Sequence, residues 1–164
     1  KNKLSMSELK EELKKDEFTD VVTYLNSGNV IFSSNREDPQ ILANKMRTRI
    51  KLGFELDIPI HVILQAELKE LLANAPEWWG DENKEIYDNV IFMMKPLSFE
   101  VLLTEIGEPK ADFERVYPYK DIVFWSFIRK EHQKTNWWAK TAKPKVKDQL
   151  TIRTANTVRK IVDM

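Results

Sequence analysis

The stretch TYLNSGNVIFSS, residues 23–34, places two short apolar runs on either side of a polar tip. The tip is made of Asn26, Ser27, Gly28 and Asn29. Glycine adopts positive φ without steric cost, and asparagine tolerates it while bonding the local backbone. We therefore predict a hairpin with strands over residues 21–25 and 29–33. Turn geometry explains the tip; a second hypothesis is that its amides bind an anion or a substrate carbonyl.

Helix signals flank this hairpin on both sides. Ser5 and Glu8 have the spacing of a capping box, which predicts an amphipathic helix over residues 5–15. Asp38 before Pro39 marks the start of a second helix, which we expect to end at Gly53. Its inward face is predicted to carry Leu42, Met46 and Ile50. Residues 58–64 have the composition of a further strand.

The second half of the chain repeats this order after a connecting helix over residues 66–75. A strand over 88–94 is followed by a helix that begins at Ser98 and ends at Gly107. The inward residues of this helix are predicted to be Val101, Leu102 and Ile106. The remaining predicted elements are a hairpin of residues 113–117 and 122–128 around Pro118, a helix over 131–141, a strand over 150–153 and a helix over 157–162.

The predicted order of the second half is strand-helix-strand-strand-helix-strand, a complete ferredoxin-like unit. The first half is the same unit without its opening strand. We therefore predict an α+β protein of two tandem ferredoxin-like units, over residues 1–64 and 87–164, joined by a connecting helix and Trp-rich link at 65–86. In a ferredoxin-like sheet the opening strand lies in the middle, so its absence would leave two strand edges unpaired. We therefore expect a strand upstream of Lys1, or another segment, to occupy that place in the first unit.

Four motifs resemble a bacterial family known only as a domain of unknown function. They are KNKLSMSELKEEL, TYLNSGNVIF, APEWWG and LTIRTANTVRKI. Members of this family look like tandem ferredoxin-like repeats, and they usually begin with an apolar strand and a glycine-rich turn before KNK. Thr154 departs from the family, whose members more often carry asparagine after the arginine. The resemblance implies a fold and implies no activity.

Composition excludes several kinds of chemistry. The chain has no cysteine, so it forms no disulfide and uses no thiolate. No apolar run approaches the ~18 residues that span a bilayer, and no secretory signal is recognisable, which favours a cytoplasmic protein with no membrane partner. Its four glycines form no phosphate-binding fingerprint. His61 and His132 have no second ligand at helical spacing, so we predict no metal site and no cofactor.

Charge is polarised along the chain. Residues 129–160 hold ten bases and two acids, a net charge of +8, and the rest of the chain carries −8. Lysines can neutralise phosphates while aromatic rings stack on bases. The predicted residues for binding nucleic acid or another polyanion are Lys134, Lys140, Lys143, Lys145, Lys147, Arg153, Arg159, Trp137 and Trp138. The alternative is a solvated lysine-rich loop in which the tryptophans anchor a helix.

A second functional class is a small-molecule enzyme or ligand sensor that uses a cleft between the two units. Its candidate residues are Asn26, Ser27, Asn29, Trp78, Trp79 and Asn156, with Arg153 as a cation. Trp78 and Trp79 are adjacent in a link, so we expect one to pack and the other to be partly exposed. Packing of this pair as a wedge between the units is the simpler interpretation.

The third class is protein interaction, including self-association. Residues 122–128, IVFWSFI, are apolar on both faces of the predicted strand, which indicates that both faces are covered. Base stacking on these aromatics, as in RNA-recognition modules, is the alternative interpretation of the same stretch.

Overall fold

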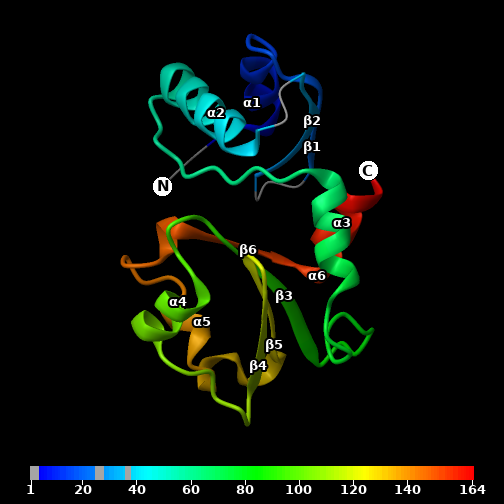
Figure 1. The fold of residues 1–164 in the computed structure, drawn as a ribbon, viewed down its shortest axis with the longest axis vertical. Coiled ribbons are helices and arrows are strands. Elements are labelled where there is room, and N and C mark those ends of the chain that lie inside the picture. The colour runs from blue at the N-terminus through cyan, green and yellow to red at the C-terminus, as the bar shows by residue number, and fades with distance from the viewer. Residues whose placement is uncertain (1–3, 25–27, 36–37) are drawn as a thin grey trace. The chain divides into compact units, whose positions relative to one another are not determined.

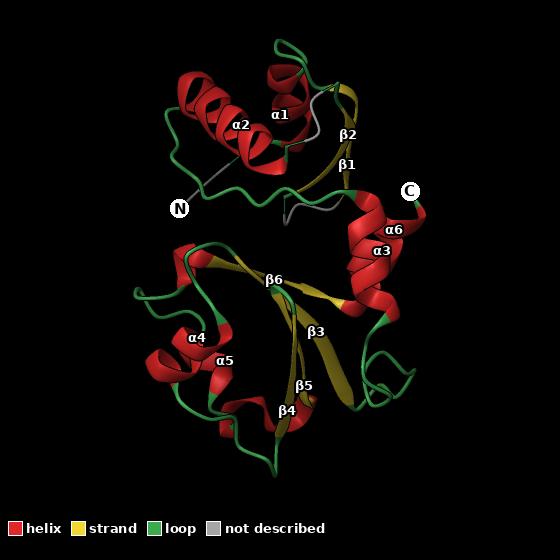
Figure 2. Ribbon diagram, viewed as in Figure 1, coloured by secondary structure: helices red, strands yellow, loops and turns green. Residues whose placement is uncertain are grey.

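The computed structural model describes residues 4–24, 28–35 and 38–164, and it shows a mixed α+β protein with two antiparallel sheets (Figures 1 and 2). The chain divides into two compact units. Unit 1 comprises Lys1–Leu64 with Asp163–Met164, and unit 2 comprises Gln65–Val162. No helix in the described part of the chain is long and apolar enough to cross a membrane.

Unit 1 contains α1 (Met6–Leu13), β1 (Thr19–Tyr24), β2 (Asn29–Ser33) and α2 (Pro39–Phe54). The strands β1 and β2 pair as the predicted antiparallel hairpin. Both predicted helix caps are confirmed. The Ser5 hydroxyl accepts a hydrogen bond from the Glu8 amide, and the Asp38 carboxylate accepts from the amides of Gln40 and Ile41. The tip residues Asn26 and Ser27 lie outside the described residues.

The core of unit 1 forms between the two helices and the hairpin. Its buried members are Leu9, Leu13, Phe18, Val21, Leu42, Met46 and Ile50. Residues 56–62 also pack on this core, through the alternate side chains of Leu56, Ile58, Ile60 and Val62. The inward face predicted for α2 is therefore confirmed.

Two predictions for unit 1 are wrong. Residues 58–64 form no strand, although their side chains alternate as in a strand. A strand is defined by its pairing, and among the described residues this segment has no ladder partner. The second error is the end of α2. The helix continues through Gly53 to Phe54, and Glu55 takes the left-handed conformation at its C-terminus, with φ 56°.

Unit 2 is built on a four-stranded antiparallel sheet in the order β4-β5-β3-β6. Its strands are β3 (Ile86–Met93), β4 (Glu114–Tyr119), β5 (Ile122–Ile128) and β6 (Leu150–Thr154). Its α-helices are α3 (Gln65–Ala73), α4 (Phe99–Ile106), the short α5 (Trp137–Lys140) and α6 (Ala155–Asp163). Two 3₁₀ turns, η1 (Arg129–Lys134) and η2 (Lys147–Gln149), complete it.

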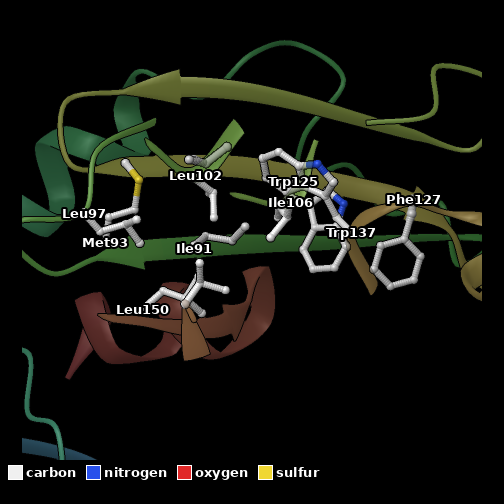
Figure 3. Close-up of a cluster of buried hydrophobic side chains, with 11 residues drawn as sticks. Ile91, Met93, Leu97, Leu102, Ile106, Trp125, Phe127, Trp137 and Leu150 are labelled. Carbon is white, nitrogen blue, oxygen red and sulfur yellow. The ribbon is translucent and has the colours of Figure 1, made fainter. Parts of the chain in front are cut away.

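Helices cover both faces of this sheet (Figure 1). On one face, α4 and α5 enclose a cluster that includes Ile91, Trp125 and Trp137 (Figure 3). On the other face lie α3, α6 and Trp79, whose indole packs edge-on against Phe124. Residues Ile122 through Phe127 are all buried, which confirms that both faces of β5 are covered.

Three local predictions for unit 2 are wrong. Ser98 caps α4 and Gly107 ends it as predicted, but Val101 is 46% exposed rather than inward. Pro118 lies inside β4, and the turn falls two residues later, at Lys120 and Asp121. The helix predicted over residues 131–141 is interrupted, because Thr135 is extended (ψ 161°) and separates η1 from α5.

The Thr135 hydroxyl explains this interruption. It donates to the His132 carbonyl at 2.7 Å and accepts from the Trp138 amide at 3.1 Å. A side chain that bonds the local backbone in this way offers an alternative to continuous helical bonding.

Candidate functional site

The best-supported candidate site is the segment of residues 140–147, here called the lysine loop. It carries Lys140, Lys143, Lys145 and Lys147. The loop is folded on its own backbone, since the Lys143 amide bonds the Lys140 carbonyl and the Lys147 amide bonds the Lys143 carbonyl. The Val146 side chain, fully buried in the core of unit 2, anchors it. The anchored backbone directs Lys143, Lys145 and Lys147 to the surface and leaves Lys140 half-buried.

Ion pairing divides the predicted basic residues into two groups. Lys134 pairs with Glu131 at 2.7 Å, and Lys145 pairs with Glu105 at 3.6 Å. Within residues 4–24, 28–35 and 38–164, the ammonium groups of Lys140, Lys143 and Lys147 form no ion pair. These three lysines are therefore the uncompensated cations of the loop.

The two tryptophans beside the loop have different environments. Trp137 is 0% exposed, packs against Trp125 and Phe99, and donates its indole N–H to the Gly107 carbonyl at 3.0 Å. It is a core residue and cannot stack on a ligand. Trp138 is 45% exposed and touches the rings of Phe127 and His132 edge-on.

Helical geometry separates Trp138 from Lys140, the next lysine along the chain. Two residues of an α-helix turn through about 200°, so the side chains of Trp138 and Lys140 leave α5 on nearly opposite sides. The two side chains therefore do not face one common ligand position. The arrangement suits recognition of charge by the lysines, and it gives no support to base stacking on Trp138 next to them.

A buried carboxylate holds α5 in place. Glu114 is 3% exposed, and its Oε1 accepts from the Trp125 indole at 3.0 Å and from the Trp137 amide at 3.4 Å. Its Oε2 accepts from the amides of Lys110 at 2.8 Å and Asn136 at 2.5 Å. Sequence reasoning missed this residue. Glu114 and Arg115 stand side by side at the start of β4, and nothing in that pair of charged residues marks Glu114 as the buried one.

The two predicted arginines do not belong to the lysine loop. Arg153 is half-buried on β6, where its guanidinium donates to the Thr151 hydroxyl at 2.7 Å and to the Ile152 carbonyl at 2.9 Å. Burial lowers the pKa of Arg153 from its usual range. Arg159 lies on α6 with its guanidinium 5.3 Å from the centre of the Trp79 ring.

The motifs APEWWG and TIRTANTVRKI meet where Arg159 lies beside Trp79, on the sheet face that carries α3 and α6. Trp79 is 5% exposed and donates its indole N–H to the Asn89 carbonyl at 2.8 Å. The Asp88 carboxylate accepts hydrogen bonds from the Ser126 hydroxyl and the Gly80 amide, and burial raises the pKa of Asp88. These contacts fix the link on the sheet, and we assign the junction a structural role.

Trp78 is half-buried, and the Arg115 guanidinium lies 6.0 Å from the centre of its ring. The prediction that one tryptophan of the pair packs while the other stays partly exposed is therefore confirmed. The contacts of Trp79 described above all lie within unit 2.

The described ligand-cleft candidates belong to different units. Asn26 and Ser27 lie outside the described residues. Asn29 in unit 1 is buried, and its side-chain amide donates to the Tyr24 carbonyl at 2.9 Å, a contact that closes the hairpin. Trp78, Trp79 and Asn156 belong to unit 2, where Asn156 is exposed on α6.

The described part of the chain holds no group of three or more His, Asp or Glu side chains that could bind a metal ion. His132 is half-buried, and its Nδ1 donates to the Arg129 carbonyl at 3.1 Å. The Arg129 guanidinium stacks on the Tyr87 ring at 4.3 Å, so both groups have structural roles.

Comparisons with known proteins place the chain among uncharacterised relatives. The model of the family described as "Protein of unknown function (DUF1697)" matches residues 1–124. A solved structure, that of the conserved bacterial protein SP0830 from Streptococcus pneumoniae, is similar over 99% of this chain and 89% of its own, with 26% identity and a TM-score of 0.83. Comparison with curated proteins found no match.

Proposed function

Since the chain belongs to the DUF1697 family of proteins of unknown function, we propose its function from its surface chemistry: unit 2 is a binding module for nucleic acid or another polyanion. The observation that carries the proposal is the lysine loop. Lys140, Lys143 and Lys147 lie within eight residues, and no described acid neutralises them. Clustered lysines without acidic partners attract phosphate groups and release their counterions.

The other basic residues contribute less to this surface. Lys134 and Lys145 would have to leave Glu131 and Glu105 to contact a phosphate. These exposed ion pairs are weak, each of about 0–1 kcal/mol, so either lysine can leave its acid for a phosphate at little cost. Because an ion pair is lost for each one gained, the exchange adds little affinity. Arg153 and Arg159 already bond β6 and Trp79. The proposed contact is therefore with three lysines and does not read base sequence.

The test is a binding titration of the whole chain with a fluorescein-labelled duplex DNA, a single-stranded DNA and heparin, at low salt. We expect the triple variant K140Q/K143Q/K147Q to bind each polyanion at least about tenfold more weakly than the parent, since each phosphate contact contributes to affinity. A control with the same change in charge, K51Q/K69Q/K160Q, removes three exposed lysines outside the lysine loop. Equal weakening in both triple variants, or no binding by the parent, would refute the lysine-loop site.

We also infer that unit 2 is a ferredoxin-like unit and that the chain carries two of them in tandem. The order β4-β5-β3-β6, with every pair antiparallel and with α4 and α5 in the two crossovers, supports this inference for unit 2. The proposed domains are residues 1–64 and 87–164, with residues 65–86 as a link whose Trp79 packs on the sheet of unit 2. The absence of cysteine supports a cytoplasmic location.

A further inference from the structure

A second exposed surface lies along β4, on the opposite face of the sheet from α4 and α5. We call Trp78, Arg115 and Tyr117 the β4 strip. Arg115 and Tyr117 pair in register with Ser126 and Phe124 of β5. Those two partners are buried beneath the elements that cover this face, whereas Arg115 is exposed and Tyr117 is 44% exposed. The cover on this face is therefore incomplete over Arg115 and Tyr117.

The strip combines aromatic surface with one cation. The Tyr117 ring lies 6.4 Å from that of Phe124, and the Arg115 guanidinium lies 6.0 Å from the Trp78 ring. In the described chain, Arg115 has no acidic partner within ion-pair distance. Its guanidinium therefore lies at the outer limit of a cation–π contact, and no described acid pairs with it. Trp, Tyr and Arg are the residues most enriched among those that dominate protein interfaces.

Local charge decides which partner fits. Lys120, the next cation along the hairpin, is already paired with Glu70 at 3.3 Å, and Glu70 also accepts from the Tyr119 hydroxyl at 2.6 Å. Glu77 precedes Trp78 in the link. One available cation beside an acid suits a single carboxylate better than the repeated charges of a nucleic acid.

The backbone of β4 excludes one mode of binding. Tyr119 and Ile122 are the pair that closes a two-residue turn. From this register, the backbone N–H and C=O groups of Tyr117 and Arg115 point toward β5. The backbone groups of Pro118 point the other way, toward the open edge of the sheet. Proline has no N–H, which blocks continuous pairing of an added strand. Recognition therefore depends on side chains.

We propose that the β4 strip binds an extended peptide of a protein partner that presents one carboxylate between aromatic or large aliphatic side chains. The carboxylate bonds Arg115, whose guanidinium lies 6.0 Å from the centre of the Trp78 ring, and the apolar neighbours cover the rings of Trp78 and Tyr117. This proposal rests on a different face of unit 2 from the lysine loop and does not depend on polyanion binding.

The test uses the whole ¹⁵N-labelled chain and a pool of acetylated pentapeptide amides. Each has a central glutamate and flanking residues drawn from Phe, Tyr, Trp, Leu, Ile and Val. A second pool carries glutamine at the centre. The readout is the indole N–H signal of Trp78, assigned with Trp78→Phe. We expect this signal to shift in a saturable way, with apparent affinity about fivefold weaker for the glutamine pool, as loss of an exposed charge-assisted contact predicts.

The matched variants are Arg115→Gln and Arg129→Gln, because both arginines are exposed and lie over a ring, at 6.0 Å for Arg115 and 4.3 Å for Arg129. Arg115→Gln should abolish the preference for the glutamate pool, and Arg129→Gln should preserve it. The proposal is overturned if neither pool shifts the Trp78 signal at millimolar concentration, or if both pools bind equally. It is also overturned if a single-stranded oligonucleotide shifts that signal and the peptides do not.

Discussion

Replacing Gly80 with alanine should destabilise unit 2 for two separable reasons. Gly80 has φ +83°, in the left-handed region, where a residue with a Cβ atom costs about 1–2 kcal/mol. A Cβ atom at this position would also lie 2.1 Å from Nη2 of Arg159. Arg159 would have to leave the Trp79 ring, and an exposed contact of this kind is worth about 0.5–1 kcal/mol. The expected total is about 2 kcal/mol.

The energy lost by displacing Arg159 from the Trp79 ring no longer contributes when Arg159 is absent. Arg159→Ala alone should cost about 0.5–1 kcal/mol for the lost contact with Trp79. Adding Gly80→Ala to that variant should then cost only the backbone part. The double-mutant cycle should show a coupling of about 0.5–1 kcal/mol between the two positions.

Urea unfolding followed by tryptophan fluorescence is the assay. All five tryptophans lie within residues 78–138, so the signal reports on unit 2. With a urea slope near 2 kcal/mol/M, Gly80→Ala should lower the midpoint by roughly 1 M. The reasoning is refuted if Gly80→Ala costs less than about 0.5 kcal/mol, or if it costs the same with and without Arg159.

Three further predictions concern single side chains. Burial raises the pKa of Asp88, so ionising this carboxyl in the folded protein lowers the free energy of unfolding. The loss is absent below the unfolded pKa of about 3.9 and complete above the raised pKa of the folded state. The stability of Asp88→Asn relative to the parent should therefore rise between pH 4 and pH 7 in urea unfolding, and a constant difference would contradict this. Glu114→Ala leaves buried donors, among them the Trp125 indole, without an acceptor and should cost at least about 2 kcal/mol, with a smaller loss for Glu114→Gln. An unchanged urea midpoint for Glu114→Ala would show that these bonds contribute nothing. Thr154→Ala should lower stability by about 1 kcal/mol, because the Thr154 hydroxyl accepts from the Thr157 amide at the start of α6. Thr154→Asn should be neutral by thermal unfolding, and a loss equal to that of alanine would rule out a capping role.

The resemblance described above leads us to expect asparagine at position 154, and the capping role of Thr154 is one that asparagine can also fill. Asparagine and threonine both accept from the first turn of a helix, and asparagine is the somewhat better cap. The exchange at this position therefore preserves one local function of the side chain. The hydroxyl also bonds Thr157 Oγ1 at 3.0 Å, which holds it at the helix start.

Elements whose signals are local were predictable from the sequence. Ser5, Asp38 and Ser98 each bond the first turn of the helix that follows, and a cap of this kind is encoded within four residues. The β1–β2 hairpin and β5 were predictable for the same reason, from short β-branched and aromatic runs beside turn residues.

The errors arose where structure depends on distant partners. Residues 58–64 carry a strand pattern, but strand formation needs a neighbour to pair with, and a pattern of side chains does not supply one. The break before α5 depends partly on Glu114, which accepts from the Asn136 amide across 22 residues of sequence. No periodicity within residues 131–141 reports such a contact.

The candidate site was predictable only as a region. The excess of bases over residues 129–160 is visible in the sequence, and so is the Glu131–Lys134 spacing that allows their ion pair. The pairing of Lys145 with Glu105 on α4 is not, because it depends on how the loop crosses that helix. The sequence also does not distinguish the buried Trp137 from the exposed Trp138. Which side of α5 each residue occupies depends on the break at Thr135, where the helix starts anew.

The most direct test of the lysine-loop proposal is the salt dependence of duplex DNA binding, measured by fluorescence anisotropy between 50 and 200 mM salt. Three phosphate contacts predict a slope of log K against log salt of about −2.7, which is an affinity loss of about 40-fold over that range. The variant K140Q/K143Q/K147Q should show a slope near zero. A parent slope near zero, or an unchanged slope in the triple variant, would contradict the proposed site.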